Sequence, residues 1–188
     1  MDILIVGVGG QGTLLASRVL GCYAQLSGMA CKLSEVHGMS QRGGSVVTHV
    51  RMGEHIHAPI VSPGACDLIL AFEKLEALRF AHYLRQSGIL IVNDQELMPM
   101  PVITGAASYP DNIFEQLQRW TEQLIRVPAA QIAEQAGSVK TLNIVMLGAS
   151  AAAVGLRYEL LKRAVEMCVP PATVALNSAA LEAGYKSI

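Results

Sequence analysis

Short apolar runs alternate with segments of helical pattern along most of this chain. Continuous apolar runs are typical of strands buried on both faces of a parallel sheet, whereas apolar positions three to four residues apart indicate a helix. The pattern predicts strands at 3–6, 30–34, 46–52, 55–60, 68–72, 89–93 and 124–127. It predicts helices at 13–26, 73–86, 111–123 and 129–136, and a wholly helical region from residue 139 onward, with breaks near Gly155 and Pro170-Pro171.

This alternation predicts an α/β fold, three-layer and Rossmann-like, in which helices cover a mainly parallel sheet. Gly53-Glu54 fits a hairpin turn, so segments 46–52 and 55–60 are expected to form a β-hairpin insertion. A helical C-terminal third completes the fold. Because the chain has no internal repeat and no linker-like stretch, residues 1–188 are expected to form a single domain.

A glycine-rich turn lies between the first predicted strand and the first predicted helix. Its sequence, GVGGQG, matches the GxGxxG pattern of dinucleotide-binding turns. In such turns the first glycine permits a tight bend, the second lets the backbone approach a pyrophosphate, and the third lets helix and strand pack closely. The helix N-terminus offers free N–H groups to the phosphate. The candidate binding residues are Gly7, Gly9, Gly10, Gln11 and Gly12. The alternative is a tight turn that binds nothing.

A second polar, Gly-rich segment, residues 35–45, is expected to be a loop. Glycines that expose backbone N–H groups, next to an arginine that can donate two parallel hydrogen bonds, suit an anion. An acid about 20 residues after a glycine turn often binds a ribose hydroxyl, and Glu35 lies near that position. The candidate binding residues here are Glu35, His37, Ser40, Gln41, Arg42, Gly43 and Gly44. Alternatively, Arg42 pairs with a local carboxylate and Glu35 is a solvated loop residue.

Only 15% of the residues are charged, whereas 52% are hydrophobic. Because soluble domains carry roughly 25% charged residues, we expect a large core or a partner that buries part of the surface. The net charge is −1 and the sequence contains no basic run. The charge pattern therefore does not indicate binding to nucleic acid or to an anionic membrane. The N-terminal apolar run follows no basic region and predicts a strand rather than a signal peptide, which indicates a cytoplasmic protein.

The C-terminal third carries small apolar residues on several helical faces, including Ala149, Ala151, Ala152 and Ala153. An apolar surface all round a helix implies burial on more than one side. We expect a permanent hetero-oligomer to bury part of this surface. The alternative is that the chain's own core covers these faces.

The cysteine and histidine positions predict no metal site. No two of the four cysteines have the CxxC spacing of zinc or iron–sulfur ligands. Those in apolar segments are expected to be buried thiols, namely Cys22, Cys31 and Cys168. His49, His55 and His57 would come together on the predicted hairpin, but no cysteine or paired carboxylate accompanies them. We assign no metal ligand and no catalytic residue to this chain.

Four segments stand out together: GVGGQG, EVHGMSQRGGSVVTHVR, ACDLILAFEKLEALR and NIVMLGA. With them the chain resembles the gamma-chain group of 2-oxoacid:ferredoxin oxidoreductases, in particular the beta subunits of the indolepyruvate enzymes. The resemblance runs from residue 2 to about residue 184. The GGQG turn combined with MSQRGG is much more specific than the turn alone, and HGMSQRGG favours the aryl-pyruvate branch over the pyruvate and 2-oxoglutarate branches.

The resemblance implies a reaction. In this family a 2-oxoacid is decarboxylated on thiamine diphosphate, electrons pass through iron–sulfur clusters to ferredoxin, and the acyl group passes to coenzyme A. The chain has neither cysteine clusters nor a GDG-type thiamine diphosphate motif. The resemblance therefore implies a non-catalytic subunit, inactive alone, whose larger catalytic partner holds both cofactors. It also implies that coenzyme A lies against residues 7–12 and 40–44.

Two other interpretations stay open at this point. The first is a stand-alone NAD(P)- or FAD-binding oxidoreductase or a nucleotide-sensing module, because the GxGxxG pattern by itself indicates a dinucleotide. The second is a purely structural subunit whose glycine turn is empty.

Overall fold

The computed structural model describes residues 1–37 and 44–188, with the backbone alone for His37. These residues form a six-stranded sheet in the order β2-β3-β1-β4-β5-β6. The strands are β1 (Asp2–Val8), β2 (Ala30–His37), β3 (Ser45–Gly53), β4 (Cys66–Ala71), β5 (Leu84–Asn93) and β6 (Leu124–Val127). β1, β4, β5 and β6 run parallel, whereas β3 runs antiparallel between β1 and β2. The mainly parallel sheet predicted from the sequence is confirmed.

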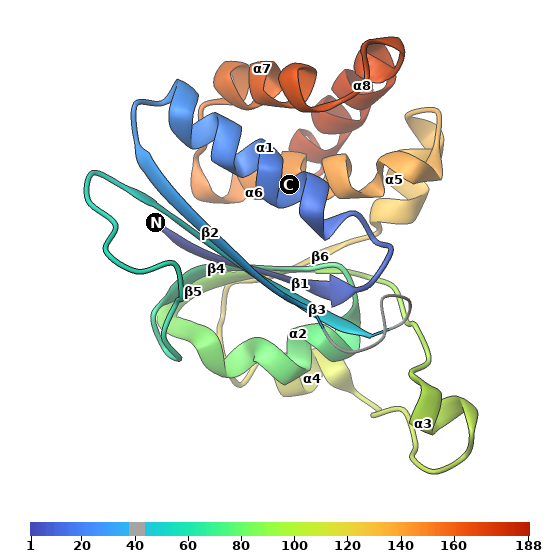
Figure 1. The fold of residues 1–188 in the computed structure, drawn as a ribbon. Coiled ribbons are helices and arrows are strands. Elements are labelled where there is room, and N and C mark those ends of the chain that lie inside the picture. The colour runs from blue at the N-terminus through green and yellow to red at the C-terminus, as the bar shows by residue number, and fades with distance from the viewer. Residues whose placement is uncertain (38–43) are drawn as a thin grey trace.

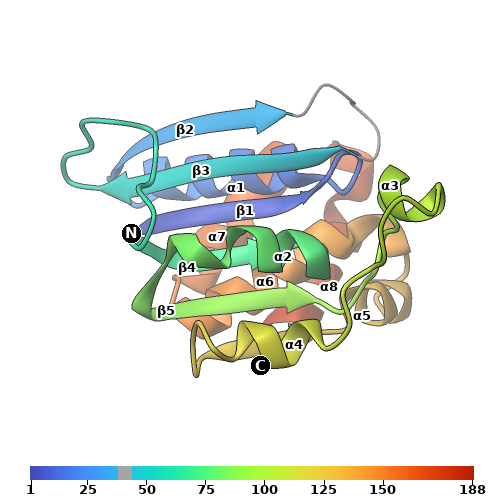
Figure 2. The same ribbon diagram turned by 90° about the horizontal axis from the view of Figure 1, so that it is seen from below.

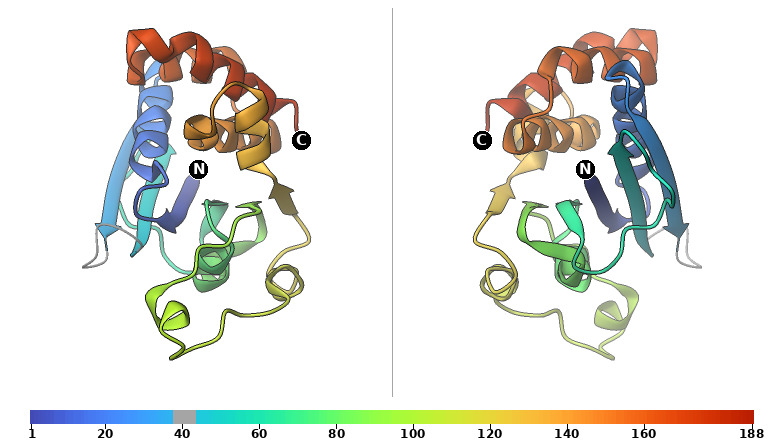
Figure 3. Two further views of the ribbon diagram at one scale, coloured as in Figure 1. Left: turned by 90° about the vertical axis from the view of Figure 1, so that its right-hand side faces the viewer. Right: turned by 90° about the vertical axis from the view of Figure 1, so that its left-hand side faces the viewer.

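Helices cover both faces of the sheet (Figure 1). One face carries α1 (Thr13–Leu26), α5 (Ala129–Gln135) and α6 (Leu142–Val154), and the other carries α2 (Lys74–Phe80) and α4 (Ile113–Leu117). The last two helices, α7 (Tyr158–Cys168) and α8 (Val174–Tyr185), pack on α1 and α6 as an additional covering (Figure 3). The short helix α3 (Met100–Ile103) projects from the body (Figure 1). Short 3-10 turns lie at Ala81–Tyr83, Val139–Thr141 and Pro171–Thr173.

Successive residues of β1 supply two cores on opposite faces of the sheet. Ile3 and Ile5 belong to the core on the α1 and α6 side, whereas Leu4 and Val6 belong to the core on the α2 side. All four side chains are fully buried. Because side chains alternate along a strand, burial on both faces requires a continuous apolar run, which is the pattern seen in the sequence.

The helix α6 is buried on nearly every side by the chain itself. Every residue from Asn143 to Ala151 is buried, and α6 contacts β4, β5, α5 and α8. Ala149 and Ala151 are fully buried, and Ala152 and Ala153 are half-buried. The chain's own core therefore covers these faces, and they give no support to a hetero-oligomer.

The predicted hairpin between segments 46–52 and 55–60 is wrong. β3 pairs with β2 along one side and with β1 along the other, so no edge of β3 is left for a third strand. Residues 54–65 instead run as an irregular segment toward β4. β3 is antiparallel to both β2 and β1, and β2 continues past its predicted end to His37. Residues 35–37 are therefore strand rather than loop.

The predicted helix 73–86 ends early because its last residues belong to β5. α2 ends at Phe80, and β5 begins at Leu84. Leu84 pairs with Cys66 of β4, and the Arg85 guanidinium lies 2.7 Å from the Asp67 carboxylate. Pairing with β4 thus overrides the helical propensity of this segment.

Two smaller differences concern the helices. α4 is shorter than the predicted helix 111–123, and the segment 98–110, where no helix was predicted, contains the single turn α3. In the part of the chain that the structure describes, no helix is long and apolar enough to cross a membrane.

Candidate ligand-binding site

The candidate site lies where the carboxyl ends of β1, β4 and β5 meet at one edge of the sheet (Figure 2). The glycine turn follows β1, Glu73 follows β4, and Asn93 ends β5. In open α/β sheets this edge is the one at which ligands bind. The edge therefore brings together groups that the sequence keeps far apart.

The glycine turn presents unpaired N–H groups at the start of α1. Gly10 has a φ of 103° and Gly12 a φ of 81°, values at which a β-carbon is strained. Gly12 is the N-cap residue, no side chain caps the helix, and its first turn contains no acidic residue. The N–H groups of Thr13 and Leu14 thus have no acceptor among the described residues. A helix start of this kind attracts anions.

Gln11 holds the turn in shape from within. Its Oε1 accepts a hydrogen bond of 2.7 Å from the N–H of Val8, and its Nε2 donates one of 3.0 Å to the carbonyl oxygen of Phe72. The same carbonyl accepts a hydrogen bond of 3.0 Å from Asn93. Gln95 lies at the edge of this network, 3.4 Å from the Gln11 amide nitrogen. The Gln11 side chain therefore links the ends of three strands and positions the turn.

Two of the glycines make room for side chains. A β-carbon on Gly7 would lie 2.8 Å from Gln11 Oε1, so Gly7 leaves space for the Gln11 side chain. A β-carbon on Gly12 would lie 2.6 Å from Asn143 Nδ2, which donates a hydrogen bond of 3.3 Å to the Gly12 carbonyl. The close packing expected between helix and strand at Gly12 is thus packing against the start of α6. A β-carbon on Gly10 would meet nothing within 4 Å, so this position is open to a ligand.

The second predicted segment is described only at its two ends. Residues 38–43 lie outside the described part of the chain, and with them the candidate residues Ser40, Gln41, Arg42 and Gly43. The backbone of His37 ends β2. The carbonyl oxygen of Gly44 accepts a hydrogen bond of 3.0 Å from the N–H of Gly9. The second motif therefore meets the glycine turn through Gly44.

Glu35 lies away from β1 because β3 separates β2 from β1. It is paired with Thr48, which is in turn paired with Ile5, and the Thr48 hydroxyl donates a hydrogen bond of 3.1 Å to Glu35. With neighbouring strands about 4.8 Å apart, Glu35 lies about 10 Å from β1. In a dinucleotide-binding Rossmann fold the ribose-binding acid follows the strand next to β1. The position of Glu35 thus argues against NAD(P) or FAD binding.

A cavity of about 290 Å³ opens on the α2 side of the turn, between Val8, Gly9, α2 and residues 97–99. The charged and hydroxyl groups that line it are Ser45, Glu73, Glu76 and Arg79. Glu73 is fully buried and caps α2 by accepting a 3.0 Å hydrogen bond from the N–H of Glu76. The Tyr109 hydroxyl donates a further hydrogen bond of 2.6 Å to Glu73. The cavity is therefore rich in carboxylate oxygens.

The two sides of the turn have opposite polarity. Burial raises the pKa of Glu76 and the nearby Glu73 carboxylate raises it further, whereas the hydrogen bond from Ser45 and the Arg79 guanidinium, 3.5 Å away, lower it. Burial and the hydrogen bond to Glu73 raise the pKa of Tyr109. Carboxylates repel phosphate but accept hydrogen bonds from N–H and O–H groups. The α1 side therefore suits an anion, and the α2 side suits hydrogen-bond donors.

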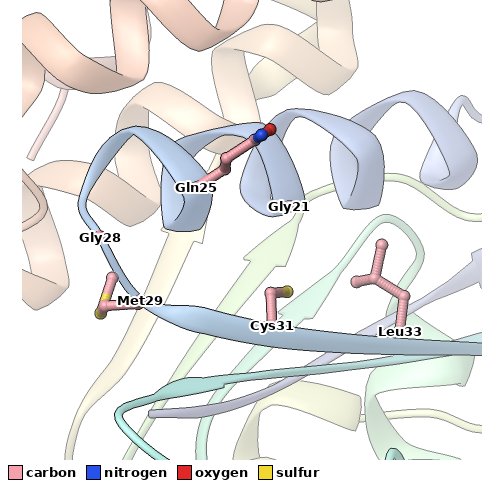
Figure 4. A pocket seen from close by; sticks show the side chains of 6 residues that line it. All are labelled: Gly21, Gln25, Gly28, Met29, Cys31 and Leu33. Carbon is pink, nitrogen blue, oxygen red and sulfur yellow. The ribbon is translucent and has the colours of Figure 1, made fainter.

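A larger and shallower cavity of about 490 Å³ lies at the other end of α1 (Figure 4). Its lining consists of Gly21, Gln25, Gly28, Met29, Cys31 and Leu33. The side chains of Cys31 and Leu33 project from β2 toward α1 (Figure 4). Since no lining residue is charged, this cavity suits apolar contact and has no group to bind phosphate. The glycine turn remains the better candidate site.

The histidines do not share a strand face. His49 is buried in β3, where its Nδ1 accepts a hydrogen bond of 3.2 Å from the N–H of Val61 and burial lowers its pKa. His55 and His57 lie in the irregular segment after β3. Among the described residues, no three His, Cys, Asp or Glu side chains form a possible metal site.

Several contributors to the site were not predicted, among them Glu73, Gln95 and Asn143. Glu73 had a signal, because an acid directly after a strand and three residues before a second acid, Glu76, fits a helix-capping pattern. Asn143 had none, since its partner Gly12 is 131 residues away.

The fold and the glycine turn define a class of protein, the small gamma-type domain of 2-oxoacid:ferredoxin oxidoreductases. The structure of the gamma subunit of a keto/oxoacid ferredoxin oxidoreductase from Geobacter sulfurreducens PCA superposes with a TM-score of 0.73, at 26% identity over 98% of this chain and 96% of that one. A family model described as pyruvate ferredoxin/flavodoxin oxidoreductase matches residues 2–187. The chain belongs to this family.

One relative indicates the type of subunit, and another shows a second context in which the domain occurs. The indolepyruvate oxidoreductase subunit IorB of Thermococcus kodakarensis is 38% identical over 193 residues, covering 99% of this chain and 95% of that protein. The ketoisovalerate oxidoreductase subunit VorA of Methanothermobacter marburgensis is 29% identical over 147 residues, which cover 78% of this chain but 27% of VorA. A domain of this type thus also occurs within a longer polypeptide.

Proposed function

We propose that this chain is the non-catalytic beta subunit of an indolepyruvate, or other aryl-pyruvate, ferredoxin oxidoreductase in the cytoplasm. The observation that carries the proposal is the full-length similarity to the indolepyruvate oxidoreductase subunit IorB. The HGMSQRGG segment of the sequence supports the same branch of the family. The displaced position of Glu35 counts against the stand-alone NAD(P) or FAD enzyme.

In this proposal the complex oxidatively decarboxylates an aryl 2-oxoacid to an acyl-CoA and transfers the electrons to ferredoxin. Thiamine diphosphate and the iron–sulfur clusters belong to a larger catalytic subunit. The cysteine spacing of this chain supports that division, because no two of its four cysteines have the CxxC spacing of iron–sulfur ligands. VorA supports it too, since most of that longer polypeptide lies outside the matched domain.

We assign part of the coenzyme A site to the glycine turn. The described residues fit such a ligand, because the start of α1 offers unpaired N–H groups to a pyrophosphate and Gly10 leaves open space beside them. The Glu76 carboxylate, which lines the cavity, could accept a hydrogen bond from an amide N–H group of the pantetheine arm. Arg42 is assigned to a phosphate from its sequence context alone.

Residues 97–110 form the surface that we assign to the larger subunit. None of these residues is charged, although the segment is mostly exposed. Met98, Met100 and Ile103 are 47%, 65% and 64% exposed. Exposed apolar patches mark interaction sites, and methionine side chains adapt readily to a partner. Because residues 97–99 also line the cavity beside the turn, a partner docked here would close the candidate site.

The proposal is tested by expressing the chain with the larger subunit of its own complex. The complex, purified without oxygen, is assayed for coenzyme A-dependent reduction of ferredoxin with indolepyruvate, phenylpyruvate, pyruvate and 2-oxoglutarate. We expect activity only in the complex and the highest kcat/KM with the aryl-pyruvates. A complex that prefers pyruvate or 2-oxoglutarate would contradict the aryl-pyruvate assignment, and NADH-dependent activity of the chain alone would contradict the subunit assignment.

A pair of variants tests whether residues 97–110 contact the larger subunit. Met100→Lys combined with Ile103→Lys places two charges on the exposed patch and should weaken co-purification of the two subunits. Ile188→Lys is the matched control, because Ile188 is an apolar residue with 50% exposure outside the segment. Equal co-purification of the two variant proteins would remove residues 97–110 from the interface.

A further inference from the structure

Three sulfur atoms meet between α1 and α7. Cys22 lies in the second half of α1, and Met167 and Cys168 are the last two residues of α7. Cys22 Sγ lies 3.8 Å from Met167 Sδ. The Cys168 thiol lies beside the Cys22 thiol, and burial together with this neighbour raises the pKa of Cys168. The trio thus combines two thiols and one thioether from segments far apart in the sequence.

The three residues of the trio differ in burial. Cys22, Cys31 and Cys168 are half-buried, so the prediction that they are buried thiols is wrong. Met167 is 65% exposed. The buried residues of α7, which belong to the core shared with α1, are Leu161, Ala164 and Val165. Cys22 and Cys168 pack against the edge of this core as partly buried side chains, whereas Met167 is mostly exposed.

We propose that Cys22, Met167 and Cys168 bind one soft monovalent metal ion, of the class of Cu(I). Thiolate and thioether ligands select such soft ions over Mg²⁺, Ca²⁺ and Mn²⁺. In a trigonal plane, metal–sulfur bonds of about 2.3 Å place the sulfur atoms about 4.0 Å apart. The distance of 3.8 Å between Cys22 Sγ and Met167 Sδ is close to that value, so this pair can bind without moving the helices.

The charges of the site also fit a monovalent ion. Binding releases the two thiol protons to solvent, and two thiolates with one Cu(I) leave a single net negative charge. Arg18, one turn before Cys22 on α1, can offset it. Burial and the Cys22 thiol raise the pKa of Cys168, and the positive charge of Arg18 opposes that rise. Among the described residues, no His, Asp or Glu completes the cysteine pair as a metal site, so Zn²⁺ is not favoured.

The test is a titration of the full-length chain, reduced and kept free of oxygen, with Cu(I) in competition with bicinchoninate. We expect one Cu(I) per chain and an X-ray absorption spectrum with sulfur as the only neighbour of copper. Cys22→Ser and Cys168→Ser should abolish binding. Met167→Leu keeps a similar volume at an exposed position and should weaken binding about tenfold, as the loss of a supporting group at a metal site does.

Cys31→Ser is the matched control, because Cys31 is another half-buried thiol but lies on β2. It should bind Cu(I) as the unmodified chain does. Circular dichroism checks the fold of every variant, and Met167→Leu keeps the test decisive if the serine variants fold poorly. The proposal is overturned if the unmodified chain takes no Cu(I) from bicinchoninate or forms a Cys22–Cys168 disulfide in its place. It is equally overturned if Met167→Leu binds normally or Cys31→Ser loses binding.

Discussion

Gly148 of α6 and Gly184 of α8 face each other where the two helices pack together: a β-carbon on Gly148 would lie 3.1 Å from the carbonyl carbon of Gly184. The same β-carbon would overlap the carbonyl oxygen of Leu181, and a β-carbon on Gly184 would overlap that of Val145. The helix backbones are therefore in direct contact. This contact anchors the C-terminal helix on α6, whose first residues touch the glycine turn.

The first prediction concerns this helix contact. Gly184→Ala should lower the free energy of unfolding by about 1–3 kcal/mol, because overpacking against rigid backbone forces the helices apart. Urea unfolding followed by circular dichroism measures the change. Gly21→Ala is the control, since Gly21 is also inside a helix but a β-carbon there would meet only the flexible Leu33 side chain at 3.3 Å. The explanation fails if Gly184→Ala is as stable as Gly21→Ala.

The second prediction separates backbone strain from ligand binding at Gly10. Gly10→Ala places a β-carbon at positive φ, which costs about 1–2 kcal/mol. The strained turn should reorient its N–H groups and weaken coenzyme A binding about tenfold, or 1.4 kcal/mol. Gly64→Ala carries a similar strain in a loop away from the turn, with a φ of 74° and no atom within 4 Å of an added β-carbon. Calorimetry that finds equal affinities in the two variants would exclude Gly10 from the site.

The third prediction concerns the inward-facing Gln11. Gln11→Glu replaces the amide that donates to the Phe72 carbonyl with a carboxylate that repels it. We expect a loss of about 1–3 kcal/mol in the free energy of unfolding, as for other buried hydrogen bonds that lose a partner. Gln25→Glu, on the exposed side of α1, should leave stability nearly unchanged. Equal unfolding curves for the two variants would show that the Gln11 network contributes nothing to the fold.

The fourth prediction is a pH dependence. Because burial raises the pKa of Glu76 above 4.5, the folded chain keeps this proton to higher pH than the unfolded chain. Its contribution to stability is fully present below the unfolded pKa and is lost as the pH rises through the folded pKa. Glu76→Gln cannot ionise, so its stability relative to the unmodified chain should increase as the pH rises above 4.5.

Urea unfolding at a series of pH values measures this difference. Glu115→Gln is the control, because Glu115 is exposed on α4 and should show no such trend. A difference for Glu76→Gln that stays flat, or that falls with pH, would contradict the assignment of burial as the dominant cause.

The strands and helices were largely predictable from the sequence, because each buried strand consists of a continuous run of apolar residues. The pairing of the strands was not predictable, since it depends on contacts between residues that lie far apart in the sequence. Gly88 shows the difference: it follows the predicted helix 73–86, yet it lies inside β5, where a β-carbon would be 2.9 Å from the carbonyl oxygen of Cys66. No residue near Gly88 in the sequence carries that information.

The position of the candidate site was predictable from the sequence, but the roles of its residues were not. The GxGxxG pattern located the turn after β1, because it encodes local backbone conformation at Gly10 and Gly12. It could not show that Gln11 turns inward, since its acceptor on Phe72 is 61 residues away. The insertion of β3, which moves Glu35 away from β1, is likewise a property of topology.

The hydrogen bonds of Gln11 to Val8 and Phe72 have a consequence for how the turn meets a ligand. They are made entirely within the chain, so the turn has its shape before any ligand arrives. Ordering a flexible loop on binding costs conformational entropy, roughly 1–2 kcal/mol for each residue that becomes fixed. A preorganised turn avoids that cost, and its affinity for a ligand then reflects the contacts themselves. Association at the turn should accordingly be a single step, without a slow rearrangement after the first encounter.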